Sequence, residues 1–254
     1  MAGPTEFGLF FTLLLSWSFC ATPEKKVCQG ANNKLALLGT VDDHYQILVK
    51  MYSNCTVILE NLEITYMTEK HDLSFLRSIQ EVGGYVLIGI NTAPRIPLEN
   101  LRIIRGHSLY DDKYALTALL NYNNSIGQGV NQLPLTSLTE ILKGGIKFAS
   151  NDHLCNVETI QWTDILNMKS QPKIKEESNS AEHCKKCDRS CYNGSCWGPG
   201  PQNCQKSKVG PGLLVLGTHT HCRQQQKSER PAAFWDGPKT EKHDPTVTHQ
   251  TAWN

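Results

Sequence analysis

Three stretches of the chain follow one template, and this repeat constrains the fold more than any other feature of the sequence. Each has apolar residues at steps of three, Leu-x-x-Leu-x-x-Ile, followed by glycine and a short run typical of a β-strand. The copies begin at Leu73, Leu98 and Leu135, and the strand-like runs cover residues 85–88, 115–119 and 146–148. Such repeats indicate a solenoid, in which stacked coils bury one another's apolar residues. The pattern predicts a mainly β fold with strands in parallel sheets.

An ordinary βαβ domain stays open on periodicity alone. The segments between the expected strands are short for crossover helices, which favours the solenoid. One helix is expected early, over residues 39–54, where Asp42 and Asp43 suit the positive end of the helix dipole. Apolar residues recur at helical spacing within it, at Tyr45, Leu48, Val49 and Tyr52. Cysteines flank this helix, and Cys155 and Trp162 follow the last strand, as end caps of a stack would.

The first residues and the cysteine content indicate export. Residues 7–19 (FGLFFTLLLSWSF) form an apolar run too short for a bilayer span, and small residues follow it. We expect a signal peptide over residues 1–21 and a secreted, extracellular mature chain without membrane insertion. Ten cysteines fit an oxidising compartment. A net charge of +1 argues against a nucleic-acid partner.

The composition changes twice towards the carboxyl end. Residues 170–179 are polar and charged, which marks a linker, and a cysteine cluster with almost no aliphatic residues follows. Its spacing could serve a zinc site, but behind a signal peptide disulfides are favoured, so we expect a small disulfide-held module and no metal. From residue 207 the chain shows no repeat and is expected to be a disordered tail. In this tail His219, His221 and Cys222 could offer metal ligands, but no fourth ligand is near. The mature chain holds nine cysteines, so Cys222 is left over and could link two copies into a dimer.

The sequence contains candidate glycosylation sites but none of the common catalytic motifs. Three Asn-x-Ser/Thr sequons, at Asn54, Asn123 and Asn193, are candidates for glycosylation in an exported chain. No phosphate-binding loop, nucleophile elbow, HExxH motif or kinase signature occurs. We therefore expect neither an enzyme nor a cofactor.

Several segments resemble the ectodomain of the epidermal growth factor receptor family. They are residues 25–30 (KKVCQG), 61–66 (NLEITY), 72–76 (DLSFL), 84–88 (GYVLI), 97–106 (PLENLRIIRG), 155–162 (CNVETIQW) and 193–198 (NGSCWG). The resemblance implies a right-handed β-helix of the leucine-rich-repeat-like receptor L domain type over residues 25–170. It implies the start of a furin-like cysteine-rich domain over residues 171–206, and residues 207–254 resemble nothing in the family.

The resemblance also implies particular residues. It pairs Cys28 with Cys55, Cys155 with Cys184, Cys187 with Cys196 and Cys191 with Cys204. It places Leu35, Leu37, Gly39, Tyr66, Ile90, Asp111 and Leu119 against the growth factor. In this scheme Leu35 and Ile90 supply apolar contact, Gly39 close backbone approach and Asp111 a salt bridge to a basic ligand residue. Leu37 stands where the family usually has a polar residue.

These features predict a secreted, truncated receptor ectodomain that binds EGF-like growth factors weakly and cannot itself signal, since the family's membrane span and tyrosine kinase are missing. Two alternatives remain. The chain could bind EGF-family receptors as a dominant-negative partner, although the family's dimer-contact loop is missing, or it could be a product without function.

Overall fold

The computed structural model describes residues 25–177 and 184–206. The predicted signal peptide, the tail from residue 207 and Cys222 lie outside the described residues.

The described residues are mainly β, with few helices, as the repeat predicts. The strands are β1 (Val27–Cys28), β2 (Val57–Ile58), β3 (Leu62–Thr65), β4 (Glu81–Val82), β5 (Val86–Gly89), β6 (Ile103–Ile104), β7 (Tyr114–Leu119), β8 (Tyr122–Asn123), β9 (Gln128–Gly129), β10 (Glu140–Ile141), β11 (Gly145–Ala149) and β12 (Ile174–Glu176). The α-helices are α1 (Val41–Tyr52) and α2 (Trp162–Ile165). Short 3₁₀ turns cover Ser74–Ser78, Val157–Thr159, Met168–Ser170, Tyr192–Gly194 and Pro201–Asn203.

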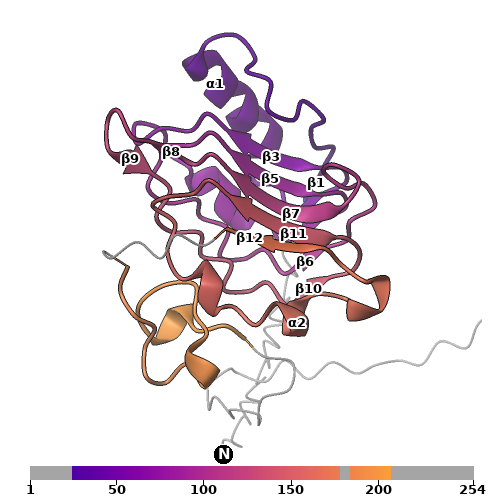
Figure 1. Ribbon diagram of the computed structural model, residues 1–254. Coiled ribbons are helices and arrows are strands. Elements are labelled where there is room, and N and C mark those ends of the chain that lie inside the picture. Colours follow the sequence, from indigo (N-terminus) through magenta and orange to yellow (C-terminus); the bar gives the residue numbers. More distant parts are fainter. Residues whose placement is uncertain (1–24, 178–183, 207–254) are drawn as a thin grey trace, which may run out of the picture. The chain divides into compact units, whose positions relative to one another are not determined.

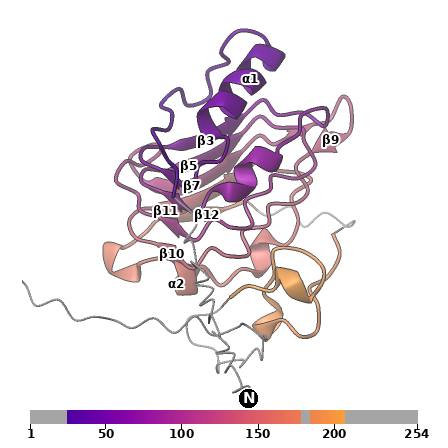
Figure 2. The same ribbon diagram turned by 180° about the vertical axis from the view of Figure 1, so that it is seen from behind.

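Two parallel sheets organise the chain. One has the strand order β1-β2-β4-β6-β10 and the other β12-β11-β7-β5-β3, so successive turns of chain add one short strand to the first sheet and one to the second. Figure 1 shows the second sheet, with α1 at its β3 end, and the view from behind in Figure 2 shows the same placement of α1. Strands β8 and β9 form a separate antiparallel hairpin.

The repeated leucines form the core between the sheets. Each of the three Leu-x-x-Leu-x-x-Ile stretches has its three apolar side chains buried in one continuous cluster. The register of the first copy differs from the prediction, however. Ile104 pairs with Ile141 on one side and with Val82, not Ile79, on the other. In the first copy, the residue that aligns with Ile104 therefore lies three positions later in the chain than the repeat predicts.

Buried asparagines join successive turns of the chain at the carboxyl ends of the second sheet's strands. Asn91, Asn121 and Asn151 are stacked, with Asn91 Nδ2 donating to Asn121 Oδ1 at 3.0 Å and Asn121 Nδ2 donating to Asn151 Oδ1 at 2.8 Å. Each also donates to a backbone carbonyl of the neighbouring strand that comes earlier in the chain. The acceptors are the carbonyls of Ile64 in β3, Ile88 in β5 and Ala118 in β7. This asparagine ladder satisfies backbone groups where the chain leaves the sheet.

The early helix forms where the sequence predicts it. Thr40 caps it, and its hydroxyl accepts from the Asp43 N–H while Asp43 accepts from the Thr40 N–H, a capping box. The helix buries His44, Leu48 and Tyr52, whereas Tyr45 and Val49 of the apolar series are only half-buried.

The linker interpretation is wrong for part of its length. Residues 174–176 form β12, which pairs in parallel with β11 and completes the second sheet. All three side chains are exposed, and they alternate an apolar residue with charged ones. Charge on an exposed edge strand is a common device against aggregation, and it makes such a strand resemble a linker in composition.

Four disulfides hold the described cysteines: Cys28–Cys55, Cys155–Cys184, Cys187–Cys196 and Cys191–Cys204. These are the pairs that the family resemblance implies. The cysteine module also contacts residues 161 and 162 directly. Trp197 packs edge-on against Trp162 with ring centroids 5.7 Å apart, and Gln205 exchanges two hydrogen bonds with the backbone of Gln161.

Candidate functional site

The candidate site lies on the face of the second sheet that points away from the main core. Side chains alternate along a strand, so Leu62 and Ile64 of β3 enter the core while Glu63 and Thr65 point to the opposite face. A second apolar cluster, separate from the core, covers this outer face. Its members are Tyr85, Leu87, Tyr110, Leu119 and Ala149, with Leu35 and Tyr114 packed against them.

Residues 33–39, the docking segment, lie over this face beside β3. The carboxylate of Glu63 fixes the start of the segment, because its Oε2 accepts from the Asn33 N–H at 2.7 Å and from the Lys34 N–H at 3.0 Å. Its other oxygen accepts from the Tyr85 hydroxyl at 2.6 Å. Glu63 is 2% exposed, so three donors compensate a buried carboxylate.

Two further side chains hold the rest of the docking segment. The Tyr66 hydroxyl donates to the Leu35 carbonyl at 2.8 Å. The Leu38 N–H donates to His44 Nδ1 at 3.2 Å, while His44 Nε2 lies 2.9 Å from Thr65 Oγ1. Burial is the main cause that lowers the pKa of His44, opposed by the negative charge of Glu63. A neutral imidazole fits these contacts.

The docking segment presents both apolar side chains and backbone groups. A Leu35 methyl group lies so close above Gly89 that a Cβ there would meet it at 2.6 Å. Leu37 is 40% exposed. Within the part of the chain that the structure describes, the N–H groups of Leu35 and Leu37 have no hydrogen-bond partner. Gly39 has φ +77°, which glycine adopts without strain.

Residues in left-handed backbone conformation form a ridge along one border of the face. Tyr66, Ile90, Leu120 and Ser150 all have positive φ and directly follow strands β3, β5, β7 and β11. Left-handed φ is a genuine outlier for a β-branched residue such as Ile90. Strain of this kind is concentrated at functional sites. Leu120 is 46% exposed, whereas Leu119, the predicted contact, is 9% exposed within the outer cluster. Leu120 was not predicted. An asparagine follows it, as one also follows Ile90 and Ser150, and this repeated asparagine is a signal that could have found it.

Asp111 lies before β7, so the six-residue strand separates it from Leu120. That length corresponds to about 20 Å. Its carboxylate is 3.2 Å from Lys147 Nζ, which also lies over the rings of Tyr110 and Tyr114 at 5.9 and 5.4 Å from their centroids. Lys147 was not predicted either. The structure thus gathers Leu35, Tyr66, Ile90 and Leu119 at one end of the face and places Asp111 at the other.

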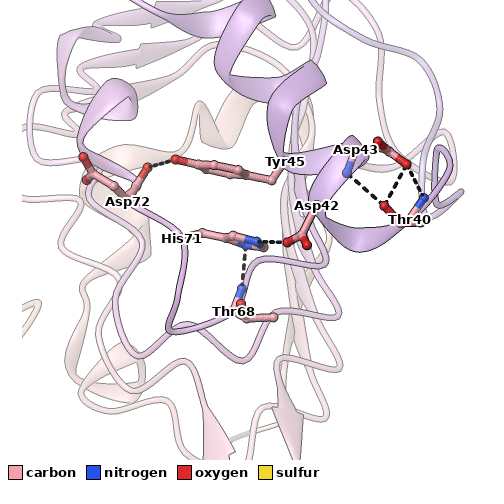
Figure 3. A network of polar contacts seen from close by, with 7 residues as sticks. All are labelled: Thr40, Asp42, Asp43, Tyr45, Thr68, His71 and Asp72. Carbon is pink, nitrogen blue, oxygen red and sulfur yellow. Dashed lines mark hydrogen bonds and ion pairs between the residues drawn. The ribbon is translucent and has the colours of Figure 1, made fainter.

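A polar network joins α1, and with it the end of the docking segment, to residues 68–72 (Figure 3). His71 is stacked on Tyr45 with centroids 4.3 Å apart, its Nδ1 accepts from the Thr68 N–H at 3.1 Å, and its Nε2 lies 3.4 Å from Asp42. The Tyr45 hydroxyl donates to the Asp72 carbonyl at 3.1 Å. These contacts fix the helix that follows Gly39.

The three sequon asparagines are all exposed but differ in their surroundings. Asn123 is in the β8–β9 hairpin, where its Oδ1 accepts from the Ser125 N–H at 3.0 Å. Asn54 precedes the fully buried Cys55, and Asn193 lies two residues before the buried Ser195.

Within residues 25–177 and 184–206, no group of three or more His, Cys, Asp or Glu side chains could hold a metal ion. A bilayer-spanning helix, long and apolar enough for that role, is also absent from these ranges.

Comparisons with known proteins agree on one family. The sequence pattern of the receptor L domain matches residues 54–166. The chain is 48% identical over 206 residues to the epidermal growth factor receptor of Gallus gallus, covering 80% of this chain and 29% of that protein. It is 51% identical over 203 residues to the melanoma receptor tyrosine-protein kinase of Xiphophorus maculatus, covering 76% and 17%. It is 46% identical over 182 residues to the human receptor tyrosine-protein kinase erbB-4, covering 71% and 14%. The chain therefore spans less than a third of the length of these relatives.

Proposed function

We propose that this chain, which belongs to the epidermal growth factor receptor family through its receptor L domain, binds EGF-like growth factors on the outer face of the second sheet. The observation that carries the proposal is the docking segment. It offers unpartnered backbone N–H groups at Leu35 and Leu37 beside the ridge residues Tyr66 and Ile90. That combination suits an extended peptide strand, which gains affinity from backbone hydrogen bonds and specificity from side chains.

Each predicted contact residue has a role in this proposal. Leu35, Leu37 and Gly39 receive a ligand strand, and Tyr66 and Ile90 contact apolar ligand side chains, with Leu119 supporting them from the outer cluster. Asp111 pairs with a basic ligand residue. Because Asp111 already contacts Lys147, the ligand cation must compete with an internal one. This pair contributes selectivity more than affinity, since exposed ion pairs stabilise by only about 0–1 kcal/mol.

The remaining assignments are proposed on the family relationship. The stacked parallel strands are coils of a right-handed β-helix, residues 25–170 are the L domain, and residues 171–206 begin the furin-like cysteine-rich domain. The protein is secreted after removal of residues 1–21 and carries glycans at Asn54, Asn123 and Asn193. Cys222 lies outside the family match, and it is proposed to link two copies only because it is left over from the four disulfide pairs.

Titration calorimetry of the monomer with an EGF-like growth factor tests the function. A growth factor held by two linked L domains makes two contacts, whereas a single L domain offers one. Losing the second of two linked contacts commonly lowers avidity about 10²–10⁴-fold, so we expect a Kd of roughly micromolar. Asp111→Lys should weaken binding by up to about fivefold, the equivalent of about 1 kcal/mol, and Asp112→Lys, a matched change at the neighbouring exposed carboxylate, should leave it unchanged.

Absence of binding by the folded monomer at ligand concentrations of about 100 μM would overturn the proposal. Capture of intact EGF-family receptor without growth factor would favour the dominant-negative role instead.

A further inference from the structure

We propose that Glu63 and His44 are positioning residues for growth-factor binding: they hold the two ends of the docking segment, and His44 makes its conformation sensitive to acid. This inference rests on the proposed function and adds residues that touch no ligand.

The docking segment depends on side chains because it lacks a sheet partner. Among the described residues, its one backbone–backbone hydrogen bond joins the Ala36 N–H to the Asn33 carbonyl, a bond within the segment itself. Its attachment to the sheet therefore rests on Glu63, Tyr66 and His44. Without them the segment would be ordered only on binding, and ordering a segment on binding lowers affinity.

Glu63 holds the start of the segment through a charge. Two backbone N–H groups converge on one carboxylate oxygen, and hydrogen bonds to a charged acceptor are about twice as strong as neutral ones. The Tyr85 hydroxyl fixes the other oxygen, so the carboxylate cannot rotate away. The amide of a glutamine keeps the shape of this side chain but removes the charge.

His44 holds the end of the segment through its neutral form. Nδ1 accepts from the Leu38 N–H, which requires an unprotonated nitrogen, so the ring proton is on Nε2 and points to Thr65 Oγ1. The Tyr66 ring packs edge-on against the imidazole with centroids 5.7 Å apart. A second proton would place two N–H donors, at Nδ1 and Leu38, against each other and release Leu38.

Opposing effects act on the pKa of His44. Burial disfavours the protonated ring and is the largest effect, while the negative charge of Glu63 and a hydrogen bond to the backbone of Thr65 favour it, so the pKa of His44 is lowered. Tyr66 faces the ring from the end of β3, and the neighbouring Asp43 on α1 is engaged by Thr40. Protonation therefore belongs to acidic conditions, below the ordinary range of histidine near pH 6.5.

The first test compares Glu63→Gln with Glu81→Gln. Glu81 is in the other sheet, where it pairs with Arg105, so its variant is a matched control for loss of one carboxylate. We expect Glu63→Gln to raise the growth-factor Kd about tenfold through faster dissociation, and to accelerate hydrogen exchange at the Asn33 and Lys34 amides in the free protein. Unchanged affinity and unchanged exchange would refute the role of Glu63.

The second test measures Kd from about pH 7.5 to about pH 5.5 for wild type and His44→Asn. The asparagine Oδ1 can accept from Leu38 but does not titrate. Both proteins are tested with the same growth factor. Any effect of pH on the growth factor itself is therefore the same for both and cancels in the ratio of their Kd values. We expect the acid weakening, together with acid loss of protection at the Leu38 amide, to be smaller in His44→Asn.

The outcomes separate the two proposals. If wild type binds no growth factor at either pH, the proposed function fails. If it binds, but Glu63→Gln binds equally well and His44→Asn is equally acid-sensitive, then only the positioning role fails.

Discussion

Replacing Asn121 with alanine tests whether the asparagine ladder holds the stacked strands together. Asn121 is the central rung and is almost completely buried. Its Nδ2 donates to Ile88 O at 3.0 Å and to Asn151 Oδ1 at 2.8 Å, and its Oδ1 accepts from Asn91 Nδ2 at 3.0 Å and from the Asn91 N–H at 3.2 Å. The alanine variant removes all four bonds, and each loss takes a partner from a buried group of Ile88, Asn91 or Asn151.

The expected cost follows from those partners. A hydrogen bond contributes about 1 kcal/mol net, and a buried group left without a partner costs about 1–3 kcal/mol. Some partners will recover through water or small shifts, so we expect Asn121→Ala to lower the free energy of unfolding by about 3 kcal/mol. In a protein of this size that corresponds to a fall in Tm of about 6–12 °C.

Urea denaturation of the disulfide-intact protein, followed by circular dichroism, measures this effect. The matched control is Asn124→Ala, the same change at an exposed position of the β8–β9 hairpin, which should cost less than about 0.5 kcal/mol. If Asn121→Ala costs no more than this control, the ladder does not stabilise the stack and the reasoning is wrong.

Three other results are expected. Replacing both Cys28 and Cys55 with serine should destabilise the protein by about 2–5 kcal/mol in the same urea assay, because it opens a loop between residues 27 positions apart; an effect below about 1 kcal/mol would contradict this. Gly89→Ala should displace the flexible Leu35 side chain and weaken growth-factor binding while Tm changes little, as calorimetry and thermal melting can show; unchanged affinity would mean that Leu35 is not a contact. Because the folded state lowers the pKa of His44, its stabilising contribution is present above about pH 6.5 and is lost as the pH falls through the folded pKa. Urea midpoints measured against pH should therefore fall less steeply in His44→Asn than in wild type, and parallel curves would count against this.

The leucine repeat was sufficient to predict parallel strands and most of the core, because each copy of the repeat must bury the same positions. It could not fix the register of the first copy. Steps of three continue from Leu73 through Leu76 and Ile79 to Val82, so the sequence pattern is identical when shifted by one step, and only the pairing of Val82 with Ile104 decides between the alignments. The charged edge strand β12 was not predicted because its composition is that of an exposed linker. It is a strand because it pairs with β11.

The candidate site was less accessible from the sequence for two physical reasons. Glu63 is a lone acid in an apolar strand, and its importance depends on the docking segment returning across the sheet to meet it. Lys147 likewise becomes informative only when Tyr110, Tyr114 and Asp111 are placed around it. Neither relation leaves a local pattern, because each joins residues that are distant in the chain.

The left-handed ridge shows how stability and recognition share one structural feature. A left-handed residue other than glycine costs about 1–2 kcal/mol, so Tyr66, Ile90 and Leu120 would not adopt this conformation unaided. The asparagine ladder lies beside them and stabilises the exit of each strand by several hydrogen bonds, which can offset that cost. The backbone of the ridge is thus fixed by buried groups, while its side chains remain available to solvent. Substituting those side chains can change what the face recognises without disturbing the stack, whereas substituting the asparagines should disturb both.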